Sequence, residues 1–137
     1  MANWAGEPGN VIRPEDRENF TKLLAEFRRQ LDAYGRKTRA HHPLTAFLPA
    51  NPATMDAGYE GRKIFKYLDF ATVQGYDFHG GWDAVTNQQS ALRVPAGAPD
   101  NPDFSAEVAI DGWITRGAPR DKLVLGIPYY GRGWTGV

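Results

Sequence analysis

Residues 68–81, LDFATVQGYDFHGG, predict a strand that ends in a group of polar side chains. The first half is apolar and rich in β-favouring residues, as expected of a strand that is buried on both faces. Gln74, Tyr76 and Asp77 follow directly. In a parallel sheet covered by helices, the carboxyl end of a strand is where polar side chains meet a ligand. An ordinary strand followed by a solvated loop would have a similar sequence, so the surrounding chain has to distinguish a ligand site from such a loop.

The composition is that of a globular domain without a strong charge. The 137 residues are 42% hydrophobic and 23% charged, which suits one modest domain with a core. Basic and acidic residues number 16 each, so no net field indicates nucleic acid or an anionic membrane as a partner. No apolar run is long enough to span a bilayer, and MANWAGEPGN does not have the pattern of a signal peptide. The absence of cysteine leaves the compartment open.

Helices and strands are expected to alternate along the chain. Pro14 and the acidic residues after it predict the start of a long helix, and Gly35 predicts its end. Apolar residues at steps of three and four give this helix one stripe that needs a partner surface: Phe20, Leu23, Leu24, Phe27, Leu31 and Tyr34. The rest is predicted as a strand over 44–48, a loop over 49–56, a short helix over 60–66, a strand over 69–77, a long loop over 78–104, a helix between Ser105 and Gly117, and a strand over 123–127.

This alternation specifies an α/β fold with a parallel sheet and helices outside it. Each predicted strand is apolar along its length and is followed by polar or aromatic residues: Pro49 and Asn51, then Tyr76 and Asp77, then Tyr129, Tyr130 and Arg132. The carboxyl ends of parallel strands meet at one edge of a sheet. The sequence therefore predicts a site at this edge.

Two motifs at this edge resemble glycoside hydrolase family 18, the chitinases. The family pattern of Met or Gln, any residue, Tyr, and Asp or Asn is matched by residues 74–77, QGYD, and the pattern G-x-P-x-Y-G-R is matched by residues 126–132, GIPYYGR. The resemblance extends over nearly the whole chain. It implies strands five, six and seven of a (β/α)8 TIM barrel, about three parallel βα units, so that residues 1–137 would be an incomplete catalytic domain.

The resemblance also implies an activity and roles for individual residues. Family members hydrolyse chitin, a β-1,4-linked N-acetylglucosamine polymer, with retention of configuration and with the substrate's own N-acetyl group as the nucleophile. Tyr76 would hydrogen-bond the acetamido carbonyl, and Asp77 would bind the distorted sugar beside it. Substrate binding would fall to Gln74, Trp82, Tyr130 and Arg132. The resemblance implies no cofactor and no metal, and it implies that the protein is secreted.

Some of these residues have structural alternatives. Tyr130 could be a packed aromatic residue, and Arg132 could form a loop salt bridge. Trp82 and Trp134 could be stacking platforms for sugars, but each could equally be a core residue, because large aromatic side chains are usually buried.

The chain departs from the family pattern in one respect that concerns catalysis. The family signature D-x-x-D-x-D-x-E, whose Glu is the general acid, does not occur in this sequence, and Glu7 lacks the preceding aspartates. We therefore expect a piece of a chitinase that is inactive alone, with the missing part of the barrel as its partner. The alternative is a non-catalytic chitinase-like protein that binds N-acetylglucosamine chains.

Other kinds of site find no support in the sequence. His41, His42 and His79 have no metal-ligand spacing, residues 131–136, GRGWTG, lack the Lys and the helix of a phosphate loop, and no Ser occupies a strand-to-helix elbow.

Overall fold

The computed structural model describes residues 8–94, 96–97 and 104–137. Its elements are α1 (Asp16–Thr38), β1 (Thr45–Leu48), α2 (Pro52–Gly58), α3 (Gly61–Ile64), β2 (Phe70–Gln74), α4 (Ala106–Thr115), η1 (Arg120–Lys122) and β3 (Leu123–Gly126). The predicted alternation of helices and strands is confirmed. Within the described ranges, no helix has both the length and the apolar character needed to cross a bilayer.

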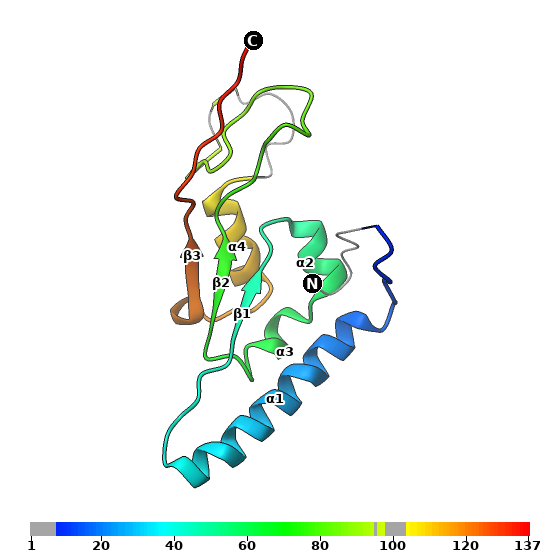
Figure 1. The fold of residues 1–137 in the computed structure, drawn as a ribbon, viewed down its shortest axis with the longest axis vertical. Helices are drawn as coiled ribbons and strands as arrows, with labels where there is room; N and C mark the ends of the chain where they lie inside the picture. The colour runs from blue at the N-terminus through cyan, green and yellow to red at the C-terminus, as the bar shows by residue number, and fades with distance from the viewer. Residues whose placement is uncertain (1–7, 95, 98–103) are drawn as a thin grey trace.

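The three strands form one parallel sheet in the order β1-β2-β3. Phe47 in β1 is level with Thr72 in β2, which is level with Val124 in β3. In Figure 1 the strands lie side by side and point the same way, and the loop after β2 and the chain after β3 extend from the same end of the sheet. In the described part of the chain, β1 and β3 each pair only with β2, so both outer edges carry unpaired backbone groups.

The two faces of the sheet differ in what covers them. Successive side chains of a strand point to opposite faces. Leu48, Ala71 and Val73 are fully buried in the core that the sheet shares with the helices. Phe47 and Val124, on the other face, are 41% and 46% exposed. The uncovered face is the one that a closed barrel would enclose.

Trp113 of α4 is the centre of the core. Its side chain is fully buried, and its indole Nε1 donates a hydrogen bond of 2.9 Å to the carbonyl oxygen of Pro49, directly after β1. The rings of Tyr59 and Phe65 meet it edge-on, with centroids 5.4 and 6.3 Å away. The tryptophan thus ties α4 to the carboxyl end of β1.

The long helix differs from the prediction at both ends. It begins at Asp16, after Pro14, and it continues past Gly35 to Thr38. Arg39 then takes a left-handed conformation, with φ 55°, and ends the helix. A Cβ at Gly35 would lie 2.5 Å from the carbonyl oxygen of Ala40, so the glycine makes room for the returning chain instead of stopping the helix.

The apolar stripe of α1 is only partly covered. Leu24 is buried in the core and Phe20 packs against it. Leu23, Phe27 and Tyr34 remain 50–56% exposed. The partner surface that the stripe predicts is therefore present for only part of it among the described residues.

Helix α2 lies where a loop was predicted. The side-chain oxygen of Asn51 accepts hydrogen bonds from the backbone N–H groups of Ala53 and Thr54, at 2.8 and 3.4 Å, and Pro52 occupies the first turn. Both features start helices. The strands and the short helix α3 are shorter than predicted, whereas α4 has the expected cap, since Ser105 Oγ accepts from the N–H of Val108 at 3.1 Å. Part of the predicted loop 78–104 lies outside the described residues.

Candidate functional site

The first part of the site is the sharp turn after β2. Gln74 ends the strand, and its Nε2 donates to the carbonyl oxygen of Tyr76 at 2.8 Å. Asp77 has a left-handed backbone with φ 53°, a conformation in which Asp is enriched. Gly75 allows the turn, because a Cβ there would lie 2.3 Å from the carbonyl oxygen of Gly126 in β3. The chain therefore leaves the strand at once and places Tyr76 and Asp77 at its carboxyl end.

The chain after β3 brings the second part. Arg132 Nη2 donates a hydrogen bond of 2.6 Å to Asp77 Oδ1, and both side chains are about one-third exposed. The rings of Tyr130 and Tyr76 meet edge-on with centroids 6.3 Å apart. The two strand ends thus bring together four residues that the sequence placed at one edge of the sheet.

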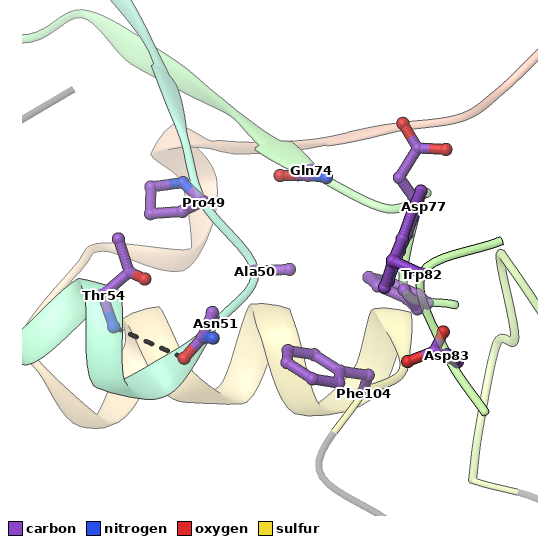
Figure 2. A pocket seen from close by; sticks show the side chains of 10 residues that line it. Pro49, Ala50, Asn51, Thr54, Gln74, Asp77, Trp82, Asp83 and Phe104 are labelled. Carbon is purple, nitrogen blue, oxygen red and sulfur yellow. Dashed lines mark hydrogen bonds between the residues drawn. The ribbon is translucent and has the colours of Figure 1, made fainter. Parts of the chain in front are cut away.

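A cavity of about 580 Å³ adjoins this pair of strand ends. Figure 2 shows Gln74, Asp77 and Trp82 on one side of it and Phe104 and Asn51 on another. The carboxylate of Asp77 points away from the side chains of Phe104 and Asn51, so it forms part of the rim of the cavity. The full lining consists of Pro49, Ala50, Asn51, Thr54, Gln74, Asp77, Phe78, Trp82, Asp83 and Phe104.

Trp82 belongs to the surface of the site. Its side chain is 61% exposed, so the alternative that it is a core residue is wrong. The guanidinium carbon of Arg132 lies 4.8 Å from the centre of its ring, which is cation–π distance. Trp134 is partly buried and does not line the cavity. Arg132 therefore joins the carboxylate of Asp77 to the face of an exposed indole.

The charges at the rim also act on Tyr130. Partial desolvation, and then the neighbouring Asp77 carboxylate, raise the pKa of its phenol above the ordinary tyrosine value. The side chain is nevertheless 49% exposed, so it is not a packed core residue, while Arg132 does form the loop salt bridge that was its alternative. The rim combines a carboxylate, a guanidinium and two phenols, which can hydrogen-bond the hydroxyl and amide groups of a polar ligand.

Sequence reasoning missed Gln89, which touches both strand ends. Its Oε1 accepts from the N–H of Asp77 at 3.3 Å, and its Nε2 donates to the carbonyl oxygen of Tyr130 at 2.9 Å. Its neighbour Ser90 donates to the carbonyl oxygen of Gly75 at 2.6 Å. The two partners of Gln89 lie 12 and 41 positions away, so no local pattern could indicate them.

Asp83 was also missed, although it lines the cavity. Its Oδ2 accepts from the N–H of Gly80 at 2.8 Å and lies 3.5 Å from Nδ1 of the buried His79. An acid directly after Trp82 in a predicted long loop was the only available signal. Within the described ranges, no three His, Asp or Glu side chains are grouped as a metal site.

Comparison with known proteins identifies the family. The family described as "Glycosyl hydrolases family 18" matches residues 3–137. Chitinase A1 from Niallia circulans is 38% identical over 136 residues, which are 96% of this chain and 19% of that protein. The chitinase ChiA74 from Bacillus thuringiensis superposes with a TM-score of 0.88 at 41% identity, over 93% of this chain and 20% of that chain.

A second solved structure gives the same result. The catalytic domain of the psychrophilic chitinase B from Arthrobacter TAD20 has a TM-score of 0.86 and 47% identity, over 93% of this chain and 31% of that chain. The chain therefore spans between 19% and 31% of the length of these proteins. Its three parallel strands and their helices agree with part of a (β/α)8 barrel. By sequence and by fold, the chain belongs to glycosyl hydrolase family 18.

Proposed function

We propose that this chain supplies the sugar-binding wall of a chitinase domain that hydrolyses β-1,4-linked N-acetylglucosamine polymers. The proposal rests on one observation above all. Asp77 after β2 and Arg132 after β3 are joined by a bond of 2.6 Å beside a cavity of about 580 Å³. This volume is in the range of small-ligand sites, and family membership supplies the class of ligand.

Each rim residue has a role in the proposal. Tyr76 donates its phenolic O–H to the carbonyl oxygen of the substrate's N-acetyl group and so holds that oxygen against the anomeric carbon. Asp77 binds the distorted sugar beside it. The Gln74 amide lines the same pocket, and Trp82 offers an aromatic face to a sugar ring. Tyr130 and Arg132 contact sugars on the leaving-group side.

The reaction in this proposal retains configuration and uses no protein nucleophile. The acetamido oxygen attacks the anomeric carbon while an acid protonates the leaving oxygen, and water then opens the cyclic intermediate. The chain has no D-x-x-D-x-D-x-E string to supply that acid. We infer that the chain does not hydrolyse chitin alone, and that the rest of the barrel is the partner that completes it.

A fluorogenic N-acetylglucosamine oligomer tests this inference. Incubated with the purified full chain, it should release no fluorophore above the buffer rate. Adding a polypeptide that carries the remaining strands and the acid should start turnover, and Tyr76→Phe in this chain should reduce it. Turnover by the chain alone that Tyr76→Phe abolishes would contradict the inference.

A second candidate is a chitinase-like protein that binds N-acetylglucosamine chains without cleaving them. Two observations favour it: the acid string is absent, and the exposed Trp82 and Tyr130 remain at the rim. Retention of both Tyr76 and Asp77 favours the enzyme, because a binding protein requires neither. The coding sequence before Met1 discriminates, since a D-x-x-D-x-D-x-E string there supports the enzyme and its replacement supports the binding protein. In both cases we propose an extracellular place of action, where the polymer occurs.

A further inference from the structure

Gln89 is the one side chain we find that hydrogen-bonds to both strand-end segments of the site, among the residues that the structure describes. It lies in the loop after β2. Its Oε1 accepts from the N–H of Asp77 at 3.3 Å, and its Nε2 donates to the carbonyl oxygen of Tyr130 at 2.9 Å. A primary amide provides an acceptor and a donor on one planar group, so one side chain can serve both partners at once.

The backbone around Gln89 is held in place, so the amide is aimed by the loop. The carbonyl oxygen of Gln89 accepts from the N–H of Phe78 at 2.9 Å. The hydroxyl of Ser90 donates to the carbonyl oxygen of Gly75 at 2.6 Å. These two contacts fix the loop on the turn after β2, and the Gln89 side chain then reaches across to the chain after β3.

The segments that Gln89 joins also carry the contact of Asp77 with Arg132. Asp77 is held through its backbone N–H, and Arg132 follows closely after Tyr130, whose carbonyl is the other partner of Gln89. We propose that Gln89 is a positioning residue that sets the separation between the Asp77 and Tyr130 segments. We further infer that Gln89 affects the affinity for an N-acetylglucosamine oligomer. This part rests on the proposed function, in which the oligomer contacts both segments.

A positioning role explains the contacts of Gln89 better than a role in the stability of the fold does. Gln89 is partly exposed and is not among the residues of the hydrophobic core. Its side-chain amide makes both of its bonds to backbone groups at the rim of the site. Its removal should therefore loosen the rim before it affects the fold.

Variants of the full chain can separate the two halves of the bridge. Gln89→Ala removes both bonds. Gln89→Glu keeps an acceptor for the N–H of Asp77 but places a carboxylate against the carbonyl of Tyr130. Gln88→Ala is the matched control, because Gln88 is exposed and its bond to Asn87 uses its backbone N–H. Each variant is compared by amide hydrogen exchange, by the NMR cross-peak between the rings of Tyr76 and Tyr130, by melting temperature and by calorimetric titration with an N-acetylglucosamine pentamer.

The expected pattern differs between the variants. Gln89→Ala should speed exchange at the Asp77 amide by about tenfold, the size of one lost hydrogen bond, and should remove the ring cross-peak. Gln89→Glu should keep the amide protected and lose the cross-peak. Both should weaken pentamer binding by about five- to tenfold while Gln88→Ala leaves all four measurements unchanged.

Three results would overturn the proposal. One is Gln89→Ala with unchanged exchange at Asp77 and an unchanged cross-peak. Another is a lower melting temperature with wild-type affinity at temperatures where the chain is folded, since that is a purely structural role. The third is an equal loss of affinity in Gln88→Ala. If the wild-type chain does not bind the pentamer, the proposed function fails, and the exchange and cross-peak data still decide whether Gln89 positions the two segments.

Discussion

Aromatic residues are held in opposite ways in the helix-covered core and at the rim of the site. Trp113 and Tyr59 in the core are 0% and 2% exposed, whereas Trp82 and Tyr130 at the rim are 61% and 49% exposed. The core indole donates a hydrogen bond to a carbonyl oxygen and packs against other aromatic rings, whereas the guanidinium of Arg132 lies over the rim indole. The same residue types thus serve cohesion in one region and remain available to a ligand in the other.

The two tryptophans give the largest expected contrast. Trp113→Ala should lower the free energy of unfolding by about 3–5 kcal/mol, because it opens a cavity in the core and leaves the carbonyl oxygen of Pro49 without its donor. Urea denaturation of the full chain measures this. In a domain of ordinary stability such a loss removes much of the total.

Trp82→Ala is the matched control for that substitution. It should change the free energy of unfolding by no more than about 0.5 kcal/mol, since the side chain is mostly exposed. Its effect should instead appear as weaker binding of N-acetylglucosamine oligomers. Equal destabilisation by the two substitutions would show that the rim is as much a part of the cohesive core as Trp113.

The boundary between the two regions can be tested at Gly75. A Cβ there would meet the carbonyl oxygen of Gly126 at 2.3 Å and Leu125 Cδ1 at 2.8 Å, so the ends of β2 and β3 would have to separate. Gly75→Ala should cost about 1–3 kcal/mol of unfolding free energy and should also weaken oligomer binding. Gly131→Ala is the control, because nothing lies within 4 Å of a Cβ at that position. A Gly75→Ala chain with wild-type stability would mean that the strand ends separate freely.

The parts of the fold that sequence could predict are those set by local chemistry. The apolar run before Gln74 and the Ser105 cap are read directly from neighbouring residues, and both are confirmed. Asn51 followed by Pro52 was an available start signal for α2 that was read as a loop. Gly35 could not be interpreted locally, because its reason is the approach of the Ala40 carbonyl after the helix has ended.

The candidate site divides in the same way. Parallel strands bring their carboxyl ends together, so the meeting of Tyr76 and Asp77 with Tyr130 and Arg132 followed from topology. The contacts of Gln89 could not be predicted in this way, because its partners lie 12 and 41 residues away and produce no periodic pattern in the sequence. Long-range polar contacts between loops are set by packing, which the sequence pattern does not contain.

Alkaline pH distinguishes the two regions through a buried phenol. Burial raises the pKa of Tyr59 from 10.0 to about 12. The unfolded chain therefore loses this proton first as the pH rises, so the stabilising contribution is complete below pH 10 and is lost toward pH 12. Between pH 8 and 11 the free energy of unfolding should fall by about 1 kcal/mol from this residue.

Urea denaturation across that pH range is the measurement, with Tyr59→Phe as the variant that should flatten the decline. Tyr130→Phe is the comparison at the rim. The pKa of Tyr130 is also raised, but its half-exposed phenol is screened by solvent, so its removal should alter the slope less. If Tyr130→Phe changed the pH dependence of the unfolding free energy more than Tyr59→Phe does, the rim phenol, not the core phenol, would contribute more to stability.

The ion pair between Asp77 and Arg132 should have the smallest effect on stability. Both side chains are about one-third exposed, and pairs of this kind contribute less than about 1 kcal/mol. Asp77→Asn is the suitable variant because Asn tolerates the left-handed backbone at φ 53°, so that charge is removed without added strain. Arg132→Ala removes the partner, and the double variant completes a thermodynamic cycle.

The cycle separates cohesion from binding at the rim. In unfolding experiments the coupling between the two residues should be below about 1 kcal/mol, as for an exposed pair. In oligomer binding each single variant should show a clear loss, because the proposed ligand contacts both groups directly. A strong coupling in unfolding together with unchanged oligomer binding would mean that this pair is structural, like the core. Its hydrogen bond would then hold the strand ends together without contributing to ligand binding.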